Sequence, residues 1–219
     1  MSLRAVVFDL DGLMFNTEDL YREVGTEILR RRGKTFEHDL LDAMMGRRPA
    51  QALAIMIEWH GLDATVEQLA AESEEIFVPI LDEKLAPMPG LLDLLEALEE
   101  SGIPKAVGTS SGRAFVENVM GRFDLISRFE FLLTAEDVAE GKPNPEIYLT
   151  AAQRFSIAPE ELMVLEDSEN GCKAAVAAGT FAVAVPASRS LVHDFSGSSL
   201  VAESLEDRRV YEALGLAKP

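Results

Sequence analysis

The pattern of apolar and polar residues changes twice along the chain, near residue 16 and near residue 87. Before residue 16 and after residue 87, short apolar runs occur at 5–8, 105–108, 129–133, 162–165 and 181–185, with a weaker run at 199–202. Runs this short and rich in valine and leucine are typical of buried strands. Helical periodicity occupies the intervals 91–100, 113–123, 145–155 and the stretch that ends at Ala178. Strands that alternate with helices predict an α/β protein with a parallel sheet covered on both faces.

Residues 16–86 show helical periodicity and no strand signal. We expect a first helix capped by Asn16 or Thr17 and closed by the basic run before Gly33. Further helices are expected at 37–45, 49–60 and 66–80, and the proline-rich stretch 84–90 is typical of a hinge. The pattern therefore predicts a helical block, 16–86, inserted into an α/β core made of residues 1–15 and 87–219.

The composition of the chain argues against some classes of binding partner. The chain has 219 residues, 47% of them hydrophobic, and a formal net charge of −18 from 20 basic and 38 acidic residues. This charge argues against binding to nucleic acid or to an anionic membrane, because phosphate contacts need clusters of Lys and Arg. A single cysteine, no N-terminal signal segment and no apolar stretch long enough to span a bilayer predict a cytoplasmic protein. These features leave the oligomeric state undetermined.

The first predicted strand ends in two carboxylates, Asp9 and Asp11, followed by Gly12. Ligands of open α/β sheets bind beyond the carboxyl ends of the strands, which is where these side chains are expected. Two carboxylates at a sharp turn form a compact anionic pocket, and such a pocket suits a hard divalent cation, Mg²⁺ above all.

Three other polar motifs follow predicted strands or lie in a tight turn. Thr109 and Ser110 precede a helix, where hydroxyls and backbone N–H groups can bind phosphate without basic side chains. Lys142 lies in a turn bounded by prolines and can supply positive charge to an acidic pocket, while Glu166 and Asp167 repeat the pattern of a strand ending in two carboxylates. Each motif alone is compatible with a helix cap or a solvated turn, but together the four are harder to explain by capping.

These four motifs, in this order, resemble those of the haloacid dehalogenase-like hydrolases, and most closely the phosphatases and mutases related to β-phosphoglucomutase. The resemblance extends to Gly171 and to the small-residue helix end at 174–179, and covers essentially the whole chain. It implies a Rossmann-like, doubly wound parallel sheet as the catalytic core, with residues 16–86 as a mobile helical cap.

The resemblance also implies roles for individual residues. Asp9 would attack phosphorus and form an aspartyl phosphate, and Asp11 would act as general acid and then base. Mg²⁺ would be held by Asp9, the backbone carbonyl of Asp11 and Asp167, with Glu166 in support. The phosphoryl oxygens would be held by Thr109, the N–H of Ser110 and Lys142.

The cap departs from the mutase pattern, since Tyr21 occupies the position of an assisting histidine and no counterpart of the mutase cap lysine is evident. This favours a phosphatase of a small phosphorylated metabolite, such as a sugar phosphate, over a phosphosugar mutase. A dehalogenase or phosphonate-cleaving enzyme is less consistent with the motifs, and a non-catalytic sensor of phosphorylated metabolites would not need Asp9. Arg47 and Arg48, between two cap helices, are candidates to bind an anionic substrate, although solvated surface arginines are the alternative interpretation.

Overall fold

The computed structural model describes residues 2–44, 47, 49–186 and 193–217. Within these residues, six parallel strands form one sheet in the order β3-β2-β1-β4-β5-β6. The strands are β1 (Ala5–Phe8), β2 (Lys105–Gly108), β3 (Leu132–Leu133), β4 (Leu162–Glu166), β5 (Phe181–Ala184) and β6 (Leu200–Val201). Sequence order reverses at β1, and helices cover both faces, so the expected Rossmann-like doubly wound sheet is confirmed.

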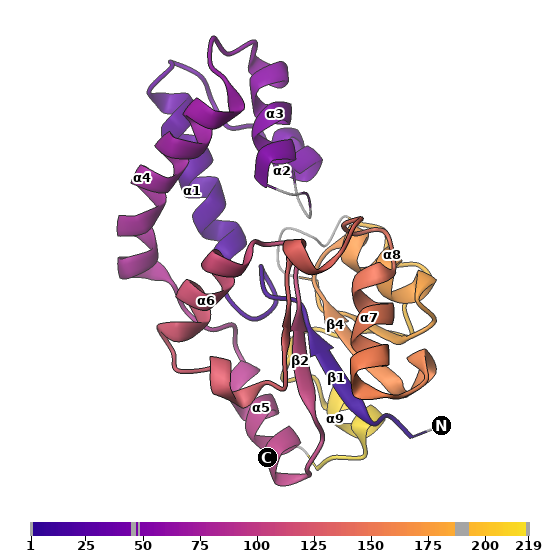
Figure 1. Cartoon of the computed structure of the whole chain (residues 1–219). Coiled ribbons are helices and arrows are strands. Elements are labelled where there is room, and N and C mark those ends of the chain that lie inside the picture. Colours follow the sequence, from indigo (N-terminus) through magenta and orange to yellow (C-terminus); the bar gives the residue numbers. More distant parts are fainter. Residues whose placement is uncertain (1, 45–46, 48, 187–192, 218–219) are drawn as a thin grey trace. The chain divides into compact units, whose positions relative to one another are not determined.

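The helices of this sheet unit lie on its two faces (Figure 1). Helices α5 (Leu91–Glu100) and α6 (Arg113–Gly121) lie on one side, and α7 (Glu146–Phe155) and α8 (Glu169–Ala177) lie on the other. This is the arrangement that right-handed crossovers between parallel strands produce. A further helix, α9 (Arg208–Leu214), follows β6.

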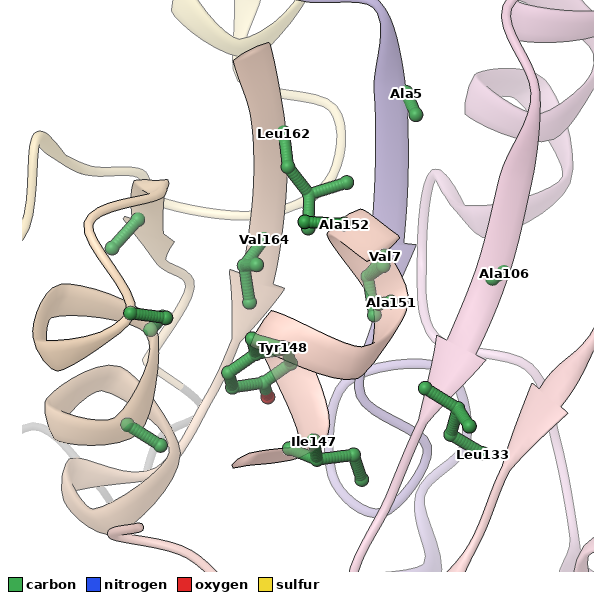
Figure 2. Packing of buried hydrophobic residues seen from close by; sticks show 14 residues of the cluster. Ala5, Val7, Ala106, Leu133, Ile147, Tyr148, Ala151, Ala152, Leu162 and Val164 are labelled. Atoms are coloured by element: carbon green, nitrogen blue, oxygen red, sulfur yellow. The ribbon is translucent and has the colours of Figure 1, made fainter. Parts of the chain in front are cut away.

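A buried apolar layer fixes α7 and α8 on the sheet. Figure 2 shows side chains of β1, β2, β3 and β4 packed against residues of α7. The layer consists of Ala5, Val7, Ala106, Leu133, Ile147, Tyr148, Ala151, Ala152, Leu162, Val164, Ala174, Ala175, Ala178 and Ala182. The many alanines let the helices approach the strands closely, and this holds the carboxyl ends of the strands at defined positions.

Residues Asn16–Ala86 form a second compact unit, separate from the unit made of Met1–Phe15 and Pro87–Pro219. It contains α1 (Thr17–Arg30), α2 (His38–Met44), α3 (Pro49–His60) and α4 (Val66–Lys84). Its own core is made of Val24, Ile28, Leu29, Leu40, Leu53, Met56, Leu69 and Ile76. Across the described residues, no helix of either unit combines the length and the apolar character needed to cross a membrane.

Four local predictions need correction. Helix α4 continues through Pro79 to Lys84 instead of ending near residue 80, and β3 is limited to two residues of the expected 129–133. Asn16 does not cap α1 with its side chain, because its amide donates to the Lys84 carbonyl (3.0 Å) and accepts from the Ala86 N–H (2.8 Å). Helix α9 was not predicted.

Candidate active site

The predicted motifs meet at one edge of the sheet because their strands are neighbours. Strand β1 lies between β2 and β4, and all three run in the same direction. Asp9 therefore follows β1 beside Thr109, which follows β2, and beside the Glu166–Asp167 pair at the end of β4. The backbone N–H of Asp9 donates to the Leu165 carbonyl (3.0 Å), which joins the ends of β1 and β4.

The side chain of Lys142 is buried at this edge of the sheet and connects several of the polar groups there. Its side chain is 3% exposed. Its Nζ donates to Asp9 Oδ1 (2.5 Å), to Glu166 Oε1 (2.6 Å) and to the Gly108 carbonyl (2.9 Å). An ammonium has three N–H donors, so protein atoms use all of them. These contacts place the ammonium of Lys142 between the carboxylates of Asp9 and Glu166.

The turn that carries Lys142 is itself anchored. The carboxylate of Glu146, in the first turn of α7, accepts hydrogen bonds from the N–H groups of Ala139 and Glu140 (both 2.9 Å). The N–H of Glu146 donates to the side chain of Asn144 (2.9 Å). These local bonds tie both sides of the turn to the start of α7.

Glu166 is the most enclosed acidic group of the edge, with 1% exposure. Its Oε1 accepts from the Tyr148 hydroxyl (2.5 Å) as well as from Lys142, and its Oε2 accepts from the Ser168 hydroxyl (3.1 Å). Gly171, in the first turn of α8, lies against the carboxylate so closely that a Cβ there would overlap it. The carboxylate is therefore held by hydrogen bonds and by steric contact.

Asp11 lies next to the hydroxyls that follow β2. Its Oδ2 accepts from Ser111 Oγ (2.6 Å) and from Thr109 Oγ1 (3.3 Å). The Ser111 N–H in turn donates to Thr109 Oγ1 (3.0 Å). After Asp11 the chain turns at Gly12 with φ +81°, a conformation that favours glycine. The half-buried Asp11 is thus fixed beside the N-terminus of α6.

Burial and charge shift the pKa values of this cluster. Burial, and then the charge of Glu166, raise the pKa of Asp9 well above its usual value, while Lys142 acts in the opposite direction. Burial alone would lower the pKa of the Lys142 ammonium, but the charges of Asp9 and Glu166 raise it above its ordinary value. Lys142 therefore keeps its positive charge and partly offsets the repulsion between the carboxylates.

The same cluster fits a divalent cation. Asp9, Glu166 and Asp167 are buried, and each offers a carboxylate oxygen within 4.8 Å of the others. Three ionised carboxylates beside the single ammonium of Lys142 would leave two negative charges uncompensated in a buried site. A divalent cation with oxygen ligands would balance them.

The remaining predicted residues lie in different places. Ser110 is half-buried between Thr109 and the start of α6. Arg47 belongs to the second unit, where it is exposed and its Nε donates to the Ala43 carbonyl (2.9 Å). Arg48 lies outside the described residues. The structure therefore brings together the predicted residues of the core and leaves the role of Arg47 open.

The sequence patterns assigned no role to two residues that contact the site. Ser111 contacts Asp11, and its position within the Thr-Ser-Ser-Gly segment was a usable signal. Tyr148 contacts Glu166 from six positions beyond Lys142, and no motif singled it out. Its hydroxyl becomes relevant only when α7 packs on the sheet.

Buried carboxylates at strand ends, a buried lysine and hydroxyls at a helix N-terminus are groups suited to binding a metal ion and a phosphate group. Residues 6–185 match the haloacid dehalogenase-like hydrolase family, and the chain belongs to this family. The expected family and the expected phosphatase class are thereby confirmed.

Individual relatives cover most of the chain. A phosphorylated carbohydrates phosphatase of Thermotoga maritima is 32% identical over 81% of this chain and 82% of its own length. A fructose-1-phosphate phosphatase of Escherichia coli is 31% identical over 82% of this chain and 95% of its own. The crystal structure of CbbY from Rhodobacter sphaeroides in complex with phosphate superposes with a TM-score of 0.81 at 26% identity, covering 93% of this chain and 95% of that one.

Proposed function

We propose that the protein is a Mg²⁺-dependent phosphatase that hydrolyses a small phosphomonoester, a phosphorylated sugar, through an aspartyl phosphate on Asp9. The observation that carries this proposal is the contact of Lys142 with Asp9 and Glu166 at the carboxyl edge of the sheet. The names of the relatives support the substrate class, because they act on phosphorylated carbohydrates and on fructose 1-phosphate.

The metal would be held by Asp9, Asp167 and the backbone carbonyl of Asp11, with Glu166 in support. When bound, it would supply positive charge that offsets the repulsion between the nucleophile and the phosphate dianion. The buried carboxylate cluster is the feature of this chain that suits it.

The chain's own residues account for the covalent steps. A carboxylate oxygen of Asp9 attacks phosphorus, the bond from phosphorus to the ester oxygen breaks, and Asp11 gives a proton to the departing alkoxide. Asp11 then takes a proton from water, which attacks phosphorus, releases inorganic phosphate and restores Asp9. The hydrogen bonds from Ser111 and Thr109 keep Asp11 in reach of both steps.

Phosphate contacts are proposed for Lys142, Thr109 and the N–H of Ser110, next to the N-terminus of α6. Since the three N–H donors of Lys142 are all used by protein atoms, a phosphoryl oxygen must replace one of these acceptors. Asp9 is the acceptor that a phosphoryl oxygen would replace most directly, because this carboxylate becomes the attacking group and loses its full charge on phosphorylation.

A phosphosugar mutase is the alternative, and it would have to protect the aspartyl phosphate from water. In helix α1, the ring of Tyr21 stacks on Phe77 (centroids 4.9 Å apart), so this position offers an aromatic face instead of the imidazole of the mutase pattern. This supports hydrolysis over transfer to a second sugar phosphate. Arg47 and Arg48 remain candidates for contact with an anionic group of the substrate.

The test is release of inorganic phosphate from a panel of sugar phosphates and small phosphomonoesters, with Mg²⁺ and with EDTA. We expect release that requires Mg²⁺ and falls at least about 10³-fold in Asp9→Ala, because the covalent step is lost. Asp63→Ala, which removes an exposed aspartate of the second unit, is the matched control and should retain wild-type activity.

Release that persists in Asp9→Ala would contradict the proposed nucleophile. Isomerisation of a sugar phosphate that depends on a bisphosphate and conserves ester phosphate would instead identify a mutase.

A further inference from the structure

Tyr148 is a fully buried residue of the site to which no role is assigned above. Its exposed fraction is 0%, and its hydroxyl donates to Glu166 Oε1 over 2.5 Å. The same oxygen accepts from Lys142, whose Nζ also lies 5.2 Å from the centre of the Tyr148 ring. Tyr148 thus touches both members of the Lys142–Glu166 pair.

The packing of α7 on the sheet determines where the ring of Tyr148 lies. Figure 2 shows Tyr148 projecting from α7 beside Val164 of β4. At the end of β2, a Cβ at Gly108 would lie 3.4 Å from Tyr148 Cε1 and 3.0 Å from Val7 Cγ1. A side chain at position 108 would therefore press on Val7 and contact the ring of Tyr148. The Gly108 carbonyl also accepts from Lys142. The close approach of α7 places the hydroxyl at Glu166.

The hydroxyl matters because Glu166 Oε1 has two donors. If the tyrosine donor is removed, this buried oxygen keeps Lys142 as its remaining partner and draws the ammonium toward itself. Lys142 must give up one acceptor to contact a phosphoryl oxygen, so a shift of its Nζ toward Glu166 weakens its contact with Asp9 and with phosphate. The Tyr148 hydroxyl, as a second donor to Glu166, therefore keeps Lys142 and Glu166 at their positions relative to each other.

We infer that Tyr148 is a positioning residue. Its hydroxyl fixes the Glu166 carboxylate, and the fixed carboxylate in turn keeps the Lys142 ammonium next to Asp9 and the phosphoryl group. The inference rests on the proposed function, since it refines how Lys142 reaches phosphate. The ring of Tyr148 packs in the core, and the hydroxyl alone carries the positioning role.

The experiment compares two tyrosine-to-phenylalanine variants of the full chain. Tyr148→Phe keeps the buried ring and removes the hydroxyl. Tyr211→Phe is the matched control, because Tyr211 is also buried (1% exposed) and its hydroxyl has no hydrogen-bond partner among the described residues. Hydrolysis of p-nitrophenyl phosphate with Mg²⁺ is measured, together with calorimetric titration of inorganic phosphate in Mg²⁺.

For Tyr148→Phe we expect kcat/KM to fall about 10- to 100-fold, the size of effect that small misplacements of a catalytic group produce. The Kd for inorganic phosphate should rise about tenfold, in line with the loss of one well-placed charged contact, while the binding stoichiometry stays that of the wild type. A purely structural role would lower the stoichiometry, through a smaller folded fraction, without changing Kd. Tyr211→Phe should match the wild type in both measurements.

A double-mutant cycle gives the decisive result. If Tyr148 acts through Lys142, Tyr148→Phe has no further effect on kcat/KM in a Lys142→Ala background. Equal effects in both backgrounds would overturn the inference, as would wild-type kcat/KM and phosphate Kd in Tyr148→Phe. Failure of the proposed function looks different: the wild type would not hydrolyse any phosphomonoester, whereas a raised phosphate Kd in Tyr148→Phe alone would still support the positioning role.

Discussion

Gly171 shows how one residue can determine the position of a catalytic neighbour. It lies in the first turn of α8, and the cap of that helix is the Ser168 hydroxyl, which accepts from the Gly171 N–H (3.1 Å). The space that a side chain would take at position 171 is filled by the carboxylate of Glu166. The absence of a Cβ is therefore a requirement of the site, because Glu166 in turn contacts Lys142.

We predict that Gly171→Ala lowers kcat/KM at least about tenfold and destabilises the protein by about 2 kcal/mol, because the new methyl group displaces a buried carboxylate. Gly121→Ala is the control. Position 121 is also helical, and the nearest atom to its added Cβ lies 3.9 Å away, so this variant should keep full activity. Steady-state kinetics and urea unfolding test both variants. Full activity in Gly171→Ala would show that Glu166 tolerates a different position.

At the scale of elements, an ion-pair cluster joins α5, β2 and the segment before β3. Glu99, at the end of α5, accepts from Lys105 (2.9 Å) and from Arg128 (2.8 Å). Lys105 is the first residue of β2 and is only 4% exposed, so Glu99 pairs with a lysine that is largely shielded from solvent. The hydrogen bond from Arg128 is the main cause that lowers the pKa of Glu99 to about 2.

This shift predicts a pH dependence of stability. A carboxylate whose pKa is lower in the folded state stabilises the fold above its unfolded pKa, near 4.5, and loses this contribution as the pH falls toward 2. We expect Glu99→Gln to lower the free energy of unfolding by about 1 kcal/mol at pH 7, since the partly exposed carboxylate is screened by solvent. The difference from the wild type should shrink between pH 4.5 and 2.

Chemical denaturation at several pH values measures the effect, with Glu100→Gln, an exposed neighbour on the same helix, as the control. A difference between Glu99→Gln and the wild type that stays constant down to pH 2 would contradict the role of this ion pair.

At the scale of the whole molecule, the chain forms two compact units with separate cores. Asn16–Ala86 is continuous in sequence, and the chain leaves and re-enters the sheet unit at Phe15 and Pro87. These two residues form an antiparallel bridge, so the ends of the interruption lie side by side. We propose that the inserted unit acts as a cap that selects the substrate, while the sheet unit carries the chemistry.

If the sheet unit is self-sufficient, replacement of residues 16–86 by a short Gly-Ser linker should leave a protein that unfolds cooperatively. It should also still bind Mg²⁺ and inorganic phosphate, since Asp9, Lys142, Glu166 and Asp167 all belong to that unit. Thermal unfolding followed by circular dichroism and calorimetric titration test this. A non-cooperative transition would show that the inserted unit is needed for folding of the sheet unit.

Much of the fold and of the site follows from local sequence patterns. Buried parallel strands appear as apolar runs. Three of the runs lead directly to a polar residue at the ligand edge, namely Asp9, Thr109 and Glu166. Helix starts are equally local, since Pro49 begins α3 and Thr65 caps α4 through a capping box with Gln68. Because strand order in such sheets follows general rules, the meeting of the motifs could be predicted without coordinates.

Only the tertiary structure decided features that depend on contacts between distant residues. Helix α4 continues past Pro79, and the turn beyond the proline makes tertiary contacts: Leu81 is buried and Lys84 pairs with Glu23 (2.6 Å). Tyr148 meets Glu166 because helix packing joins residues that no sequence period relates. Sequence patterns determine which faces are buried and which strand ends are polar, since these depend on local periodicity. The exact partner of each buried polar group depends on packing in three dimensions, and this explains why the charged groups of the core were predicted and the tyrosine that holds them was not.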